Sequence, residues 1–452
     1  MRPQKRKRLC LGGAVLLTSA GAIYNGYPLV FSDSGTYLDS SFGLKVPLAH
    51  PAFYGVFLLL THLTITLWPV VIAQGAIAAT LIYALLEIYC PDRSDVYLLT
   101  ITLILAALTP LVWFAGQIMP DAFASVLVLS LFLIVFFSER LSQRQRLAID
   151  AVFILSVLVH YSHLSLAVGL VGAVQVWALT RGGKLLGLRT AWACLAIAVA
   201  TALVFNFART GGVFLSRVTH IFPMSRLVQE GIVQRLLRER CDKSLYVLCA
   251  YRDDLKPDAG YYLYDANSPI NKLGGFVGSR EESVRIIIDS LRAYPVEHLK
   301  LAIRAAVSQL YRFRAGDGLG PYGEGTWIDK VVRKRFPREH ACFAASRQQQ
   351  GALWTDIQPL ADLYALVVLV CAIASPAVVW LDRHYVGGAT LKLHAFVWVA
   401  LILNASITGV VSLPNDRYQA RVIWLLPLAV MVSLGTLLSR MLKSAQARVP
   451  LD

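Results

Sequence analysis

Two aspartates, a tyrosine and a histidine lie close together in the first polar stretch of the chain, FSDSGTYLDSSFGLKVPLAHPAFY at 31–54. Asp33 directly follows a long apolar segment, and Tyr37, Asp39 and His50 follow it within the same stretch. An unpaired carboxylate beside a membrane span is costly, so Asp33 should face water, a basic partner or a substrate. Asp33 is therefore a candidate general base, with an ordinary interfacial aspartate as the other interpretation.

Three further acidic or imidazole side chains lie at short polar turns between apolar runs. Asp121 follows a proline in GQIMPDA, where it is either a second acid that contacts an acceptor or the N-cap of the next helix. His160 and His163 bracket a tight turn, HYSH. They are candidates to bind a phosphate or a polar sugar group, and a structural pair is the alternative.

A basic element, NDRYQAR, precedes the last apolar segment and contains Arg417, Tyr418 and Arg421. The planar guanidinium of arginine suits the geometry of a phosphate group. The two arginines are candidates for phosphate binding, and anchoring at a membrane interface is the other interpretation.

The composition indicates a polytopic membrane protein. Of 452 residues, 56% are hydrophobic and 16% are charged, and the mean hydropathy is +0.57. The net charge of +15 is spread over short loops, which favours a topology signal over a nucleic-acid surface, so no nucleic-acid partner is expected.

The apolar runs predict an all-α fold with about ten transmembrane helices. The segment 51–66 is expected to be a separate helix in the membrane interface, because Trp68-Pro69 breaks the long apolar run that follows His50. The expected spans are 9–30, 68–90, 96–116, 122–138, 147–161, 164–180, 186–208, 360–381, 391–412 and 421–439.

Lysines and arginines assign the sides of the membrane. The loops PDRSD, SERLSQRQR, RGGKLLGLR and DRHYVGGATLK share the side of the basic N-terminus, which the positive-inside rule places in the cytoplasm. The candidate residues then lie on the opposite, extracytoplasmic face of a cytoplasmic (inner) membrane. We expect a transmembrane module at 1–208, an extracytoplasmic domain at 209–359 and a second transmembrane module at 360–452.

The long polar region is expected to be mainly helical. It contains two amphipathic helices separated at Pro295, the first opened by a capping box of Ser279 and Glu282, and a more irregular part before them. Cys241 and Cys249 are expected to form a disulfide there, with Cys342 as a competing partner.

Four sequence motifs together resemble those of the integral-membrane glycosyltransferases of the GT-C fold, which use polyprenyl-phosphate sugars. This family includes protein O-mannosyltransferases and lipid A aminoarabinose transferases. The motifs are SDSGTYL, PLAHPAFYGVFLLL, MPDAFASVLVLSLFL and NDRYQARVIWLLPL. By this resemblance Asp33 matches the first acid after the first span, and Ser34 stands where many members carry glutamate. Tyr37, His50-Pro51, Asp121 and Arg417-Tyr418 match the other elements, and the resemblance does not extend to 209–359.

The resemblance implies an inverting glycosyltransferase that moves a sugar from a polyprenyl-phosphate donor to a glycan, lipid or protein acceptor. Asp33 would be the base and the arginines would hold the phosphate; no cofactor is specified, and a divalent metal is an option. The alternative is a transporter or flippase for a lipid-linked glycan, which typically has charged or interrupted spans and related halves. A membrane acyltransferase is a weaker alternative, since it would depend on His160 or His163.

Overall fold

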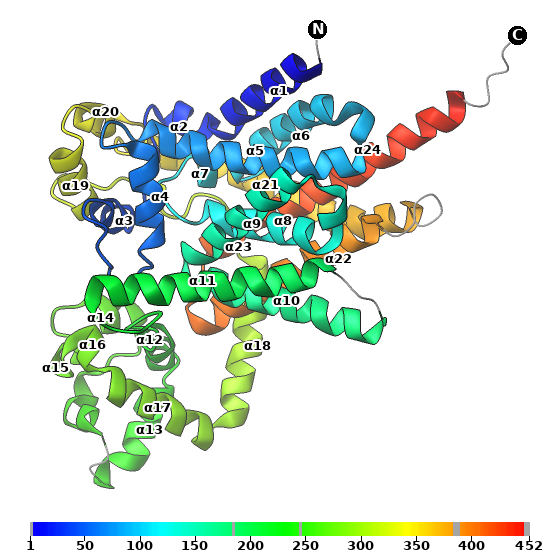
Figure 1. The fold of residues 1–452 in the computed structure, drawn as a ribbon. Helices are drawn as coiled ribbons and strands as arrows, with labels where there is room; N and C mark the ends of the chain where they lie inside the picture. The colour runs from blue at the N-terminus through cyan, green and yellow to red at the C-terminus, as the bar shows by residue number, and fades with distance from the viewer. Residues whose placement is uncertain (1–2, 183–185, 244–245, 383–388, 447–452) are drawn as a thin grey trace, which may run out of the picture.

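Helices and their connections make up the computed structural model, which describes residues 3–182, 186–243, 246–382 and 389–446 (Figure 1). Within these residues there is no β-sheet, and seven helices are long and apolar enough to cross a membrane. They are α5 (Trp68–Tyr89), α8 (Ala122–Phe137, with a short extension), α10 (Tyr161–Thr180), α11 (Leu186–Thr210), α21 (Ala352–Asp382), α22 (Ala389–Val411) and the consecutive pair α23 (Asp416–Ile423) and α24 (Leu425–Gln446). The chain is therefore an all-helical membrane protein.

Seven long helices are fewer than the ten spans expected, so that count is not confirmed. The segment 9–30 forms α1 (Pro3–Thr18) and the short α2 (Ala20–Asn25), and 96–116 forms α6 (Ser94–Leu108) and α7 (Leu111–Ala115). Pro110 separates α6 from α7, because proline cannot continue the helical hydrogen bonding. The third segment, 147–161, corresponds to α9 (Gln143–Leu158). The first turn of this helix consists of polar residues, and the helix ends three residues before the expected segment does.

The break expected at Trp68-Pro69 is confirmed. α4 (Phe53–His62) ends at Leu63, whose positive φ of 48° turns the chain, and α5 begins at Trp68 with proline in its first turn. α4 runs across the direction of α5 and α11 (Figure 1). This arrangement agrees with a short helix parallel to the membrane surface.

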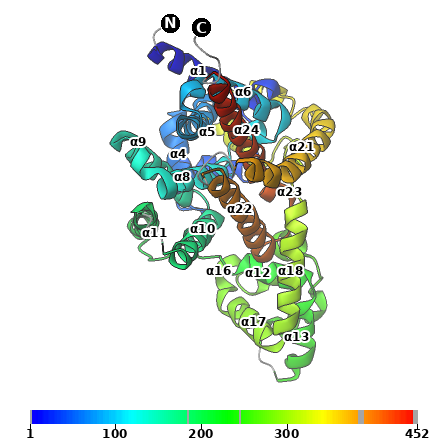
Figure 2. The ribbon, with the colours of Figure 1, turned by 90° about the vertical axis from the view of Figure 1, so that its right-hand side faces the viewer.

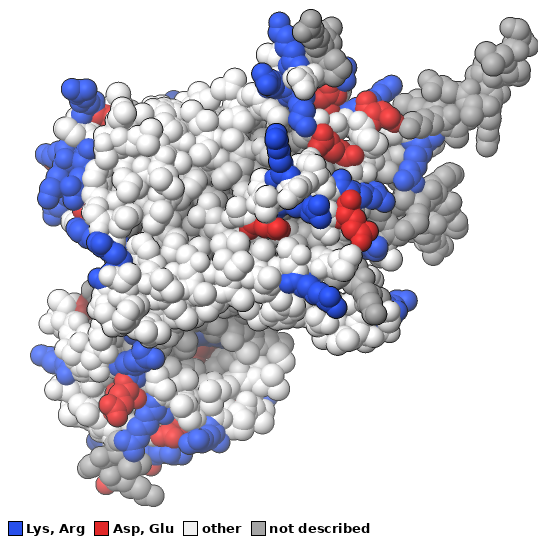
Figure 3. Space-filling model, in the orientation of Figure 1, with Lys and Arg blue, Asp and Glu red and all other residues white. Residues whose placement is uncertain are grey.

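Charged side chains gather toward two opposite ends of the face shown in Figure 3, and a largely uncharged band lies between them. Such a band is typical of a surface in contact with lipid. Part of the loops that were expected to be cytoplasmic, residues 183–185 and 383–388, lies outside the described residues.

The polar region between α11 and α21 is helical, including the part expected to be irregular. Its first part contains α12 (Ile221–Gln229), α13 (Ile232–Arg240), α14 (Ala259–Tyr264), α15 (Pro269–Lys272), α16 (Gly275–Gly278), α17 (Arg280–Ala293) and α18 (Pro295–Tyr311). These helices enclose a hydrophobic core of their own. The later α19 (Trp327–Arg335) and α20 (His340–Ala345) instead contribute to the main core of the protein.

Two detailed predictions for this region have opposite outcomes. The disulfide between Cys241 and Cys249 is confirmed, and Cys342 is a free, exposed thiol. The capping box is wrong, because Ser279 already has helical backbone angles and its side chain makes no capping bond. Glu282 instead accepts a hydrogen bond from the Leu248 backbone N–H at 2.9 Å, which ties α17 to the segment beside the disulfide.

Candidate functional site

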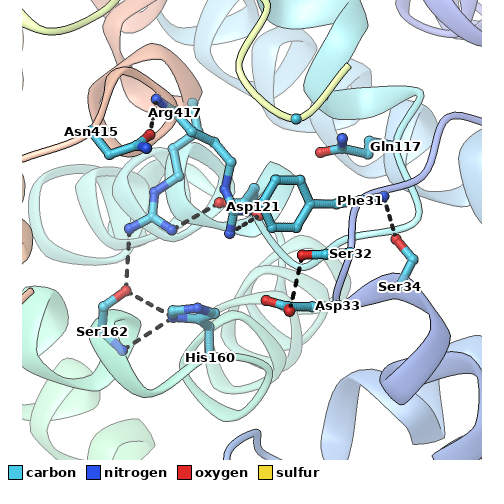
Figure 4. Close-up of polar contacts among 12 residues, drawn as sticks. Phe31, Ser32, Asp33, Ser34, Gln117, Asp121, His160, Ser162, Asn415 and Arg417 are labelled. Carbon is cyan, nitrogen blue, oxygen red and sulfur yellow. Dashed lines mark hydrogen bonds and ion pairs between the residues drawn. The ribbon is translucent and has the colours of Figure 1, made fainter. Parts of the chain in front are cut away.

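Backbone hydrogen bonds join the chain just before Asp33 to the turn just before Asp121. The N–H of Leu29 donates to the Gly116 carbonyl at 2.9 Å, and the N–H of Ile118 donates to the Leu29 carbonyl at 2.8 Å. Ser34, the first residue of α3 (Ser34–Ser41), donates its hydroxyl to the Ile118 carbonyl at 2.8 Å. Two carboxylates far apart in sequence are thereby placed in one region (Figure 4).

Asp121 is fully buried and lies between two arginines of α23. Its Oδ1 is 3.0 Å from Arg421 Nη1, and its Oδ2 is 3.4 Å from Arg417 Nη2. Burial alone would raise the pKa of Asp121, but the two guanidinium groups outweigh burial and lower it. Asp121 stands at the N-terminus of α8 without making a capping bond. Its carboxylate is thus a counter-charge for the arginines; the capping bond is not formed, and contact with an acceptor stays a prediction.

Arg421 connects Asp121 to the two histidines. Its Nη2 donates to Ser162 Oγ at 3.2 Å, and that hydroxyl lies 2.8 Å from His160 Nδ1. His160 caps α10 by accepting a bond from the Ser162 N–H, while His163 Nδ1 donates to the Ser156 carbonyl at 2.8 Å. The structure therefore brings His160 into the arginine group (Figure 4), and the His163 ring centre lies 5.0 Å from that of His160.

Arg417 stacks on an aromatic ring that the sequence did not single out. Its guanidinium lies 3.8 Å from the centre of the Phe31 ring and 5.8 Å from that of Tyr418. The Arg417 side chain is 8% exposed, and its buried Nε has no hydrogen-bond partner. Among the described residues, Arg417 is therefore a buried cation whose ion pair is with Asp121.

Asp33 is the accessible carboxylate of the group, with a side chain that is 37% exposed. Its Oδ2 lies 4.0 Å from His50 Nε2, and His50 Nδ1 lies 3.2 Å from the Tyr37 hydroxyl. Burial raises the pKa of Tyr37, so its hydroxyl keeps the proton and shares a hydrogen bond with His50 Nδ1. Burial also lowers the pKa of His50, although Asp33 opposes it. Tyr37, His50 and Asp33 therefore lie in a row, and the Ser32 hydroxyl donates to the Asp33 carboxylate at 3.3 Å.

Asp39 does not take part in this group. Its carboxylate pairs with Lys45 at 2.9 Å and with Arg335 of α19 at 3.1 Å. These contacts hold the end of α3 against α19, so we assign Asp39 a structural role.

The loop between α18 and α19 covers Phe31. A Cβ placed on Gly318 would lie 2.1 Å from the Phe31 ring, and the Tyr322 ring makes an edge contact with Phe31 at 6.5 Å. Gln348 also fixes this segment, since it accepts from the Val30 N–H at 3.0 Å and donates to the Val30 carbonyl at 2.8 Å. The glycine-rich sequence of the loop was a signal for a close approach, whereas nothing in the sequence marked Gln348.

The group can hold an anion beside Arg417 and accept a proton at Asp33. Across the described ranges, no cluster of three or more histidine, cysteine, aspartate or glutamate side chains has an arrangement that could hold a metal ion. Comparison of the chain with models of protein families, with curated proteins and with solved structures found no match.

Proposed function

We propose that the protein is an inverting glycosyltransferase of GT-C type, which moves a sugar from a polyprenyl-phosphate donor to a glycan, lipid or protein acceptor. One observation carries the proposal. A partly exposed carboxylate, Asp33, beside His50, lies in the same region as a buried arginine pair at one end of a set of long apolar helices.

The proposed reaction uses both groups. Asp33 accepts the proton of an acceptor hydroxyl while the hydroxyl oxygen attacks the anomeric carbon of the sugar. The bond from that carbon to the phosphate oxygen breaks, and its electron pair leaves on the phosphate. Arg417 stabilises the developing negative charge, and Asp121 holds both arginines in place.

An apolar pocket beside this group supports a lipid donor. It is lined mainly by hydrophobic side chains, among them Pro51, Phe53, Leu158, Tyr161 and Ala198. Pro51 follows His50 and Tyr161 follows His160, so the pocket begins next to the polar group.

We place the site on the extracytoplasmic face of the cytoplasmic (inner) membrane. The bond between Cys241 and Cys249 supports this side, because disulfides persist in oxidising compartments. The basic N-terminus and the Lys/Arg-containing loops support the same orientation.

The test is an assay of the purified protein in lipid nanodiscs with a panel of polyprenyl-phosphate sugars, measuring release of the free polyprenyl phosphate. Release should require an acceptor and should be lost with Asp33→Asn. Arg417→Ala should weaken binding of the donor by removing a phosphate contact. A transporter would instead move a labelled lipid-linked glycan across a vesicle membrane without cleaving it, and that result would refute the proposal.

A further inference from the structure

Two consecutive helices of the inserted region, α17 and α18, each expose a line of large apolar side chains. On α18 the line contains Val296, Leu299, Ile303 and Val307, which are between 47% and 61% exposed. Their spacing of three and four residues puts them on one face of the helix. On α17 the corresponding line contains Val284, Ile288 and Leu291.

The opposite face of α18 is the one that packs against the protein. Ala305 and Gln309 are buried there, and the Ala305 backbone lies against Gly409 of α22, where an added Cβ would be 2.7 Å from the Ala305 oxygen. Gln309 exchanges two hydrogen bonds of 2.8 Å with the backbone of Asn415. Within the described residues, α18 is thus held to the protein through this buried face, while the side chains of its apolar line stay about half exposed or more.

These contacts place α18 at the level where a membrane span ends. Gly409 lies in the last turn of α22, which ends at Val411, and Asn415 lies in the link to α23. In Figure 2, α22 descends toward α18, and α17 lies beside α18 in the inserted region. The exposed apolar lines of α17 and α18 thus belong to a region that packs against the end of an apolar helix long enough to span a membrane.

Basic residues flank the apolar lines. Arg285, Arg292 and the acidic Glu281 border the line of α17, and Lys300 lies beside that of α18; all four are exposed. Basic side chains around an apolar helix face suit a lipid interface, where the chains enter the acyl boundary and the cations contact phosphate groups.

We propose that α17 and α18 rest on the lipid bilayer beside the helix bundle, with their apolar lines inserted into the interface of the leaflet next to the candidate site. The inserted region would then be fixed both by α22 and by lipid. The occupant of this surface is the membrane itself, because the surface continues from the end of a span and has the charge pattern of an interfacial helix.

The test uses the full chain in nanodiscs containing lipids with a fluorescence quencher on the acyl chain. An environment-sensitive dye is attached at Ile303→Cys or Leu299→Cys, in a parent carrying Cys342→Ser and Cys371→Ser, which removes the free thiols that are not buried. Arg238→Cys on α13 is the matched control, since Arg238 is an exposed helical residue of the same region. Monodisperse gel filtration shows that each variant is folded.

The lipid quencher should reduce fluorescence at 299 and 303 and leave 238 unchanged, while aqueous iodide should have the opposite effect. Quenching of 299 and 303 by iodide to the extent seen at 238 would show that the surface is open to water and would overturn the proposal. Protection from both quenchers would also overturn it, because a protein partner, such as a second copy, would then cover the surface.

Discussion

Asp33 and Asp121 lie in the same region but have different surroundings. Asp33 has a partly exposed carboxylate near a neutral histidine, and Asp121 is buried between two arginines. A carboxylate that two cations already hold is a poor proton acceptor, because protonation would leave those cations buried without a counter-charge. We therefore assign proton transfer to Asp33 and positioning of the arginines to Asp121.

Asp33→Asn should reduce turnover by roughly 10²–10⁴-fold, the usual contribution of a general base. Expression and binding of the donor should change little, because Asp33 makes no ion pair with the arginines in the structure. The measurement is release of polyprenyl phosphate under single-turnover conditions. Asp39→Asn is the matched control and should keep most of the activity; equal activity of Asp33→Asn and wild type would refute the assignment.

Asp121→Asn should destabilise the fold itself. Removing one partner of a buried ion pair typically costs about 3–5 kcal/mol, because the remaining charge is left buried without compensation. Two buried arginines, Arg417 and Arg421, would lose their counter-charge here. Thermal unfolding in detergent should show a clear fall in Tm for Asp121→Asn and almost none for Asp33→Asn, and an unchanged Tm in both would contradict this role.

At the scale of elements, the site depends on short connections that bring distant segments into contact. The Phe31 ring lies between Arg417 and the loop at Gly318, so three segments meet at one aromatic side chain. The α4–α5 connection is fixed in a similar way by His62, which is fully buried at the end of α4.

Gly318→Ala should disturb the site without removing any polar group. Gly318 has φ of +74°, which side chains other than glycine rarely adopt, and its new Cβ would meet the Phe31 ring. We expect weaker donor binding, because Phe31 supports Arg417. Gly320→Ala is the control, since a Cβ there would meet no atom within 4 Å. Equal affinity of the two variants for a polyprenyl-phosphate donor, in a binding assay, would show that the loop does not support Arg417.

Acidification should destabilise the α4–α5 connection through His62. Its Nδ1 accepts from the Thr64 N–H at 2.8 Å, and its Nε2 lies 2.9 Å from Ser41 Oγ, so the buried ring is neutral. Burial lowers the pKa of His62 to about 4. In the unfolded chain, the His62 side chain would bind a proton near pH 6.5, the usual pKa of histidine. As the pH falls, His62 is therefore protonated in the unfolded chain before it is protonated in the folded one. The free energy of unfolding should decrease between about pH 6.5 and pH 4, by up to about 3 kcal/mol.

The measurement is the Tm in detergent between pH 7.5 and 4.5. His62→Gln retains hydrogen-bonding groups but does not titrate, so its Tm should depend less on pH. An identical pH dependence in the variant and the wild type would assign the effect to other buried histidines.

The sequence predicted those elements whose signal is local. Apolar composition predicts the long helices α5, α8, α10, α11 and α22. Proline predicts the break at Trp68-Pro69 and the separation of α17 from α18 at Pro295. The lengths of the apolar helices at α1, α6 and α9 were overestimated, because apolar composition does not show where a helix is interrupted or where it begins with polar residues.

The site was predictable in its residue types but not in its pairings. The structure brings the candidates Asp33, Asp121, Arg417 and Arg421 into one region, and their chemical roles stay predictions. That Asp121 binds both arginines depends on a contact across 300 residues, and no local pattern encodes it. Phe31 and Gln348 were missed for the same reason, because their roles come from the approach of the loop and of the segment before α21.

At the scale of the whole molecule, the proposed orientation puts the disulfide, the inserted region and the site on one side of the membrane. A cysteine introduced at position 320, in a Cys342→Ser parent, should react with a membrane-impermeant thiol reagent in intact cells. Mass mapping of the non-reduced wild type should find the Cys241 and Cys249 peptides joined and Cys342 free. Protection of position 320, or free thiols at both Cys241 and Cys249, would contradict this orientation.

The Asp121–Arg421 contact also has a consequence for biosynthesis. At about 5–20 residues per second, the ribosome needs roughly 15–60 s to synthesise the 300 residues that separate them. During that time α8 has entered the membrane while the counter-charges of Asp121 do not yet exist, so the nascent carboxylate must stay protonated or in contact with water or the insertion machinery. The site therefore closes as a late step of assembly, and a chain released before α23 would leave Asp121 without its counter-charges.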